Sequence, residues 1–152
     1  MRSSVLVLLT SAVCSFASPT WPRYTIDIEH LEVLAMRAST AVDHSAVEDM
    51  TCIDPDVNIV SHDQNVAELA ICGGIAGTIE FCGGDPTETV GESGSAKFTL
   101  TAATDGATIN ISKGRWEGCI RAARAICPTG SMSGTCVGGA STGDVDFTLD
   151  SP

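Results

Sequence analysis

The chain has 152 residues, a formal net charge of −11 at pH 7 and an aromatic content of 5%. An acidic surface repels phosphate backbones and anionic lipid headgroups, so this charge excludes nucleic-acid binding by simple electrostatics and excludes a polybasic membrane anchor. The length allows one domain with one modest core.

The first 17 residues have the composition of an export signal. Arg2 supplies the positive charge, residues 5–13 form the apolar stretch, and residues 15–17 (Ser-Phe-Ala) fit the small-x-small cleavage rule. The apolar stretch is about half of the roughly 20 residues that a transmembrane helix needs. We therefore expect a secreted, extracellular protein without a membrane span, which loses Cys14 together with its signal.

Residues 18–37 form a candidate propeptide. They contain no cysteine or glycine and end in Leu-Ala-Met-Arg, which resembles the Leu-x-x-Arg processing sites of fungal secretory propeptides. Arg37 is therefore the candidate processing residue, and a solvated N-terminal arm is the alternative. In either case residues 38–152 are expected to form a single domain, with 16 acidic and five basic residues and a formal charge of −11.

Hydrophobic periodicity predicts both helices and strands in this domain. Two strand patterns flank Asp105 and Gly106, a turn pair, and are expected to form a hairpin. The clearest helix places Trp116 and Ile120 on one apolar stripe and ends at Pro128. In chain order we expect a strand over residues 52–60, a helix over 62–72 capped by Ser61 or Asp63, a strand or extended connection over 75–81, a loop over 83–95, strands over 96–101 and 107–112, a helix over 114–127, a loop over 129–143 and a strand over 144–150.

This order of elements predicts an α+β fold. The sequence strand, helix, strand, strand, helix, strand is the split βαβ, ferredoxin-like arrangement, a two-layer sandwich with two helices on one face of a four-stranded antiparallel sheet. An all-β sandwich is the main alternative, and the helix over 114–127 is the evidence against it.

Six cysteines follow the signal and predict three disulfides, as in small exported domains. Two antiparallel helices would place Cys72 beside Cys119, so we favour the bridge Cys72 with Cys119. Cys127 with Cys136 would then close the Gly-rich loop, and Cys52 with Cys82 would remain.

Strand alternation defines a candidate binding surface on the wet side of the sheet. Apolar residues of the expected strands point toward the helices, so the polar residues between them point to solvent. Thr, Asn and Asp side chains there could hydrogen-bond sugar hydroxyls, and the alternative is an ordinary solvated sheet face. Asn110 also begins a glycosylation sequon, so the face could carry a glycan instead. The candidate binding residues are Thr99, Thr101, Asn110, Ser112, Asp146 and Thr148.

Four of the five cations of the domain lie within twelve residues, namely Lys113, Arg115, Arg121 and Arg124. One interpretation is a solvated helix face supported by Glu117 and Arg121 at i,i+4 spacing. The other is a local cationic patch that seats an anionic group, with Arg121 and Arg124 as binding residues.

No motif in the sequence is typical of catalysis or metal binding. His44 and His62 have no second ligand at metal-binding spacing, and the cysteines lack a CxxC pair. Residues 61–63 (Ser-His-Asp) are consecutive, so they cannot converge as a catalytic triad does. We expect no catalytic residues, no metal and no cofactor.

One stretch resembles a known group of proteins. Residues 110–149 contain an apolar strand, an Arg-Trp-x-x-Cys helix, a Gly-rich cysteine loop and a closing Gly-Asp-Val-Asp-Phe strand, and residues 72–77 look similar too. These features resemble small secreted cysteine-rich fungal proteins, namely killer toxins encoded by viruses of fungi, necrosis-inducing effectors that look like them, and a related glycan-binding mushroom protein. The resemblance implies a compact α/β sandwich, no enzymatic activity, and a role in host interaction or in antagonism between microbes.

We therefore expect a monomeric, secreted effector-like or killer-toxin-like protein that binds an unknown host or microbial surface target. A lectin-like protein that binds glycans through the open sheet face is the alternative. An extracellular enzyme or an enzyme inhibitor is the third possibility.

Overall fold

The computed structural model describes residues 31, 34–36, 39, 41–75 and 81–152. The expected export signal, the candidate processing residue Arg37 and most of the strand expected over 75–81 lie outside these residues. All three disulfides and every strand described below lie within residues 47–150.

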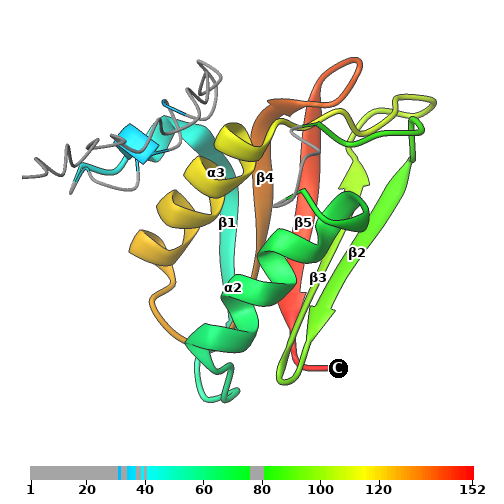
Figure 1. Cartoon of the computed structure of the whole chain (residues 1–152). Helices are drawn as coiled ribbons and strands as arrows, with labels where there is room; N and C mark the ends of the chain where they lie inside the picture. The colour runs from blue at the N-terminus through cyan, green and yellow to red at the C-terminus, as the bar shows by residue number, and fades with distance from the viewer. Residues whose placement is uncertain (1–30, 32–33, 37–38, 40, 76–80) are drawn as a thin grey trace, which may run out of the picture.

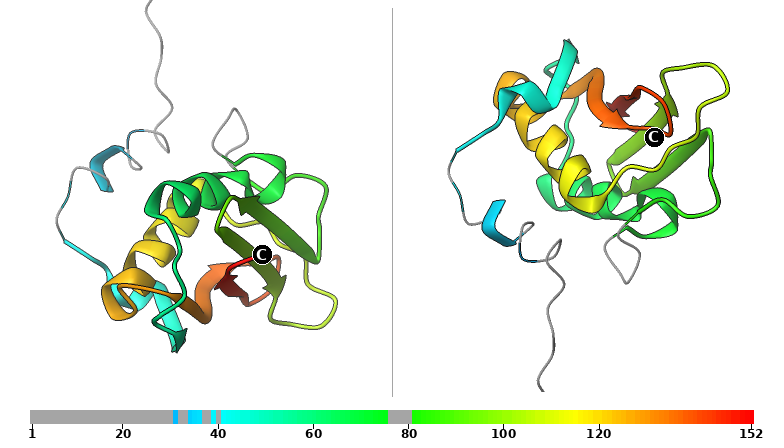
Figure 2. Two further views of the ribbon diagram at one scale, coloured as in Figure 1. Left: turned by 90° about the horizontal axis from the view of Figure 1, so that it is seen from below. Right: turned by 90° about the horizontal axis from the view of Figure 1, so that it is seen from above.

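The described residues form a two-layer α+β structure. Five antiparallel strands make one sheet in the order β1-β4-β5-β3-β2, and the two helices lie side by side on one face of it (Figures 1 and 2). The elements are η1 (His44–Ala46), β1 (Val47–Asp54), α2 (Ser61–Ala70), η2 (Ile71–Gly73), β2 (Glu88–Ser93), β3 (Ala96–Ala102), α3 (Lys113–Ile126), β4 (Ser131–Gly139) and β5 (Asp144–Asp150). The α+β class is confirmed, whereas the four-stranded sheet and the ferredoxin-like order are wrong.

Two strands lie in segments that we expected to be loops. β2 lies within residues 83–95, and β4 lies within residues 129–143. Both contain glycine, which is disfavoured in isolated strands. Close packing favours it in β4, because a Cβ at Gly134 would lie 2.4 Å from the sulfur of Met50 and 3.2 Å from the ring of Phe147, so these side chains would have to shift.

The expected hairpin between residues 96–101 and 107–112 is also wrong. β3 pairs with β2 and β5 instead, and residues 107–112 cross the end of the sheet on their way to α3. The amide of Ile109 donates to the carbonyl of Pro86, and that of Asn110 donates to the carbonyl of Gly139. Ile109 and Ile111 are nevertheless fully buried, so the period-two pattern predicted their burial correctly, although it did not predict how the segment pairs.

The other boundaries move by a few residues. β1 ends at Asp54, because Pro55 has no amide hydrogen to continue a ladder. α2 begins at Ser61 with Val60 as its N-cap and no side-chain capping bond, so the capping role expected for Ser61 or Asp63 is wrong. α3 and β5 lie within one residue of the positions expected from the sequence.

The core lies between the helices and the sheet and is centred on Trp116. Its ring meets Phe98 and Phe147 edge-on, with centroids 5.2 and 5.9 Å away. The indole Nε1 donates to the carbonyl of Glu68 at 2.9 Å, which joins α3 to α2. The fully buried side chain of Trp116 therefore contacts the sheet and connects the two helices.

The disulfides are Cys52–Cys127, Cys72–Cys82 and Cys119–Cys136, so the three favoured pairings are wrong. Cys72 lies after α2, in the 3-10 helix η2, and has a left-handed φ of 55°. Cys119 faces the sheet instead of α2, and it meets Cys136 because that residue belongs to a strand and points inward. The expectation failed because it placed Cys72 at the end of the first α-helix, which ends at Ala70, and Cys136 in a loop.

Candidate functional site

The face of the sheet away from the helices, which we call the open face, carries a row of hydroxyl groups. Thr51 on β1 pairs with Ser133 on β4, Ser133 pairs with Thr148 on β5, and Thr148 pairs with Thr99 on β3. Directly paired residues project on the same side of a sheet. These four residues, the hydroxyl row, therefore form a line across four neighbouring strands.

A second line beside the hydroxyl row mixes hydroxyls with carboxylates. In strand order it consists of Glu48, Thr135, Asp146, Thr101 and Glu88, and we call it the carboxylate row. Thr135 donates to the carboxylate of Asp146 at 2.7 Å, which orients that carboxylate within the row. The open face thus presents alternating hydrogen-bond donors and acceptors over most of its width.

Lys97, a cation on the open face, has acidic neighbours. The amine of Lys97 lies 3.9 Å from the carboxylate of Glu92, and Asp150 is its partner on the next strand. The ion pair of Lys97 with Glu92 is solvent-exposed and adds little to stability. The face therefore keeps a negative charge that favours cationic or neutral polar partners.

Four of the six residues expected on this face lie there, and two do not. Thr99, Thr101, Asp146 and Thr148 are brought together by the pairing of β3 with β5. Ser112 instead caps α3 by accepting from the amide of Arg115 at 3.3 Å. Asn110 is exposed in the crossing segment before α3, so it too was wrongly placed, although its glycosylation stays a prediction.

Thr51, Ser133 and Thr135 were missed because their strands were misassigned. Residues 132–136 (Met-Ser-Gly-Thr-Cys) do alternate between buried and less buried positions. This alternation is visible in the sequence once glycine is counted as an inward residue. It is the signal that could have identified β4.

Two cations of the cluster on α3, Arg115 and Arg124, form hydrogen bonds within the protein. Arg124 is partly buried and donates to the side chain of Gln64 at 2.8 Å and to the carbonyls of Cys127 and Gly130 at 3.1 and 3.0 Å. Burial lowers the pKa of Arg124 from its usual value, yet a guanidinium keeps its charge in proteins. Arg115 donates to the carbonyl of Val137 at 2.7 Å. These contacts favour a structural role over a patch that seats an anion.

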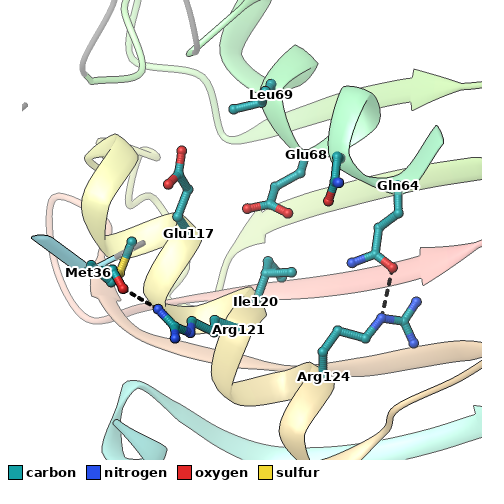
Figure 3. Close-up of a pocket in the computed structure, with 9 residues that line it drawn as sticks. Met36, Gln64, Glu68, Leu69, Glu117, Ile120, Arg121 and Arg124 are labelled. Atoms are coloured by element: carbon teal, nitrogen blue, oxygen red, sulfur yellow. Dashed lines mark hydrogen bonds between the residues drawn. The ribbon is translucent and has the colours of Figure 1, made fainter. Parts of the chain in front are cut away.

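A groove of about 470 Å³ lies between α2 and α3, and Figure 3 shows the side chains that line it. Arg121 extends from α3 and donates to the backbone carbonyls of Met36 and Ser39. Glu117 is buried on this side of α3, in contrast to the solvated position expected for it. We call this the helix groove; its lining residues are Met36, Gln64, Asn65, Glu68, Leu69, Glu117, Ile120, Arg121 and Arg124.

Of residues 61–63 (Ser-His-Asp), Asp63 forms hydrogen bonds that stabilise the fold. Asp63 accepts hydrogen bonds from the backbone amide and the hydroxyl of Ser95, both at 2.9 Å. Both bonds lower the pKa of the Asp63 carboxyl, the bond from the amide more than the bond from the hydroxyl. These bonds tie the first turn of α2 to the turn between β2 and β3. Within the described part of the chain, no helix is long and apolar enough to span a membrane, and no group of three His, Cys, Asp or Glu side chains could hold a metal.

No protein-family model, curated protein or solved structure matches this chain. A functional conclusion must therefore come from the open face, from the helix groove and from the three disulfides. Three disulfides are typical of extracellular proteins.

Proposed function

We propose that this chain is a secreted, effector-like or killer-toxin-like protein that acts by binding a host or competitor target and has no catalytic activity. The observation that carries the proposal is the hydroxyl row. It places four small hydroxyl side chains in line on adjacent strands, beside the carboxylate row. Such a surface suits the recognition of another polar surface.

The rigidity of the sheet supports this proposal. β5 and β3 lie inside the sheet, and their inward residues Phe98, Leu100, Phe147 and Leu149 are buried. Side chains that project from such strands have fixed backbone positions, so less freedom is lost when a partner binds. The open face is therefore preorganised for binding without any change in the fold.

A lectin-like function is the second candidate, and the pairing of Thr135 with Asp146 favours it. A carboxylate accepts hydrogen bonds from sugar hydroxyls, and a threonine hydroxyl both donates and accepts. Adjacent groups of these two kinds can bind neighbouring hydroxyls of one sugar ring. In this form of the proposal the target is a cell-surface glycan.

The test uses the double variant Thr99→Gln/Thr148→Gln, which places two larger side chains in the hydroxyl row. The matched control is Thr129→Gln, because Thr129 is exposed in the loop between α3 and β4 and lies off the open face. Purified protein is infiltrated into leaf tissue, added to fungal cultures and applied to a glycan array. We expect cell death or growth arrest that the double variant loses and the control retains.

Glycan binding that the double variant loses would favour the lectin-like form. An unchanged effect of a correctly folded double variant would overturn the assignment to the open face. Turnover of a polysaccharide or of RNA by the pure protein would overturn the non-catalytic part of the proposal. The absence of any effect or binding in all three assays would overturn the proposal that the protein acts by binding such a target.

A further inference from the structure

We propose that the helix groove is a peptide-binding site that the chain's own segment around Met36 occupies in cis, and that removal of this segment opens the groove to a peptide of the same kind. This proposal is independent of the open face, which lies on the other side of the sheet. The observations that carry it are the contacts of Arg121 and the packing of Met36.

Arg121 recognises the backbone of the bound segment. Its two terminal nitrogens donate to the carbonyl oxygens of Met36 and Ser39, which are three residues apart. Figure 3 shows the bond to Met36. Residues 34–36 are helical, and the amide of Ser39 donates to the carbonyls of Ala35 and Met36, both at 3.1 Å. Arg121 therefore binds the carbonyls at the C-terminal end of a helical turn, where a cation is favourable.

The side chain of Met36 lies against α3. Its sulfur is 3.4 Å from the position that a Cβ on Gly118 would take, which is ordinary van der Waals contact, so Met36 packs on the surface of α3 at this position. Leu69 and Ile120 add apolar surface to the groove. A flexible thioether adapts well to such a space.

The segment is a ligand of the domain and not a part of its core. Leu31 and Leu34 remain 49% and 43% exposed, so each of these two apolar side chains keeps close to half of its surface in contact with solvent. The buried core and the side chains packed against it begin at Val42, and every disulfide lies further along the chain. Removing the segment therefore leaves the covalent framework and the sheet complete.

The processing residue expected from the sequence, Arg37, follows Met36 directly. A cut there would separate Met36 from the domain while Ser39 stays attached. The groove would then lose its apolar occupant, and Arg121 would lose one of its two carbonyl partners. The partner that fits this vacancy is a short helical peptide that ends in a methionine or a similar unbranched apolar side chain.

The experiment begins with the full secreted chain. A recognition site for a sequence-specific protease is inserted between Arg37 and Ala38, so the segment is removed only after the protein has folded and formed its disulfides. The probe is a fluorescent peptide with the sequence of residues 26–37, and fluorescence anisotropy measures its binding. We expect saturable binding after cleavage, and binding at least about tenfold weaker before cleavage, because the tethered segment competes at a high effective concentration.

Two further changes locate the site. Arg121→Gln should weaken binding to the cleaved protein by at least about tenfold, whereas Lys113→Gln, which removes a charge from the same helix outside the groove, should not. A probe with Met36→Asp should bind the cleaved protein, which carries no further substitution, at least about tenfold more weakly than the original probe does, so this readout does not depend on the folding of a substituted variant. Thr99→Gln/Thr148→Gln should bind the probe normally, which separates this proposal from the function of the open face.

Failure of the cleaved, correctly folded protein to bind the probe would overturn the proposal. Equal binding before and after cleavage would overturn the competition in cis. Equal binding by the Arg121→Gln variant, or of the Met36→Asp probe, would show that the peptide binds elsewhere.

Discussion

Removal of the disulfides one at a time should destabilise the protein in an order set by loop length. Cys52–Cys127 joins the edge strand β1 to the end of α3 across 75 residues, whereas Cys72–Cys82 closes only 10 residues. Each bridge is removed by changing both cysteines to alanine, which leaves no unpaired thiol. Because a disulfide mainly restricts the unfolded chain, the longer loop should have the larger effect.

The expected magnitudes follow from the chain-entropy relation. A loop of 75 residues corresponds to about 4.5 kcal/mol of unfolding free energy at 25 °C, and a loop of 10 residues to about 2.7 kcal/mol. The difference of about 1.8 kcal/mol is large compared with the net stability of a small domain, which is about 5–15 kcal/mol. Cys119–Cys136 spans 17 residues and corresponds to about 3.1 kcal/mol, to which a packing loss is added because both cysteines are fully buried.

Urea unfolding of the natural protein and of each double variant measures these differences. The slope of free energy against urea should increase most for Cys52→Ala/Cys127→Ala, because its unfolded chain gains the most accessible surface. Peptide mapping of the natural protein checks the connectivity independently. A larger loss for Cys72→Ala/Cys82→Ala than for Cys52→Ala/Cys127→Ala would refute the loop-length reasoning, and any other pairing would refute the connectivity.

Two further substitutions test single contacts of α2. Gly91→Ala should lower the free energy of unfolding by at least about 1–3 kcal/mol in urea titrations, since its Cβ would lie 2.1 Å from the carbonyl oxygen of Ala67. Gly83→Ala is the control, because a Cβ at Gly83 would meet no atom within 4 Å. Equal losses of stability in the two variants would contradict the close approach of α2 at Gly91. Asp63→Asn should destabilise the protein near neutral pH and progressively less in acid, because the hydrogen bonds from Ser95 that lower the pKa of Asp63 stabilise only its ionised form. That stabilisation is fully present above the usual pKa of the carboxyl and is lost as the pH falls through the lowered pKa. A difference in unfolding free energy between the two proteins that does not change with pH would contradict this reasoning.

Hydrophobic periodicity predicted the elements that meet the core directly. β5 alternates between buried Val145, Phe147 and Leu149 and exposed polar residues, as its sequence indicates. α3 buries its Trp116 stripe for the same reason. In these elements the local pattern and the tertiary burial agree, so the sequence alone was sufficient.

The strands that the sequence did not predict are shaped by close packing. Gly91 in β2 lets α2 approach the sheet backbone, and Gly134 in β4 leaves space for Met50 and Phe147. Local propensity disfavours glycine in a strand, whereas the backbone of α2 requires it at Gly91 and the side chains beside Gly134 favour it there. Such a requirement cannot be read from a sequence before the facing element is known.

The same limit explains the disulfides and the binding residues. Cys72 has a left-handed φ of 55° after the end of α2, and no hydrophobic periodicity reveals such a turn. On the open face, Thr99 and Thr148 were placed correctly because alternation within a strand is sufficient for that. Ser133 required the missing strand β4, and Asn110 was misplaced because burial alternates in its segment without strand pairing.

The two proposed surfaces differ in how strongly they are coupled to folding, and this difference determines which substitutions can be interpreted. The open face carries no disulfide cysteine, and its exposed hydroxyls can be changed at a cost that is usually within about 0.5 kcal/mol. The helix groove contains Arg124, which joins α2 to the chain after α3 and so contributes to folding. Arg121 donates only to the N-terminal segment among the hydrogen bonds described. Substitution of Arg121 should therefore affect binding in the groove with little effect on the fold, whereas substitution of Arg124 should affect both.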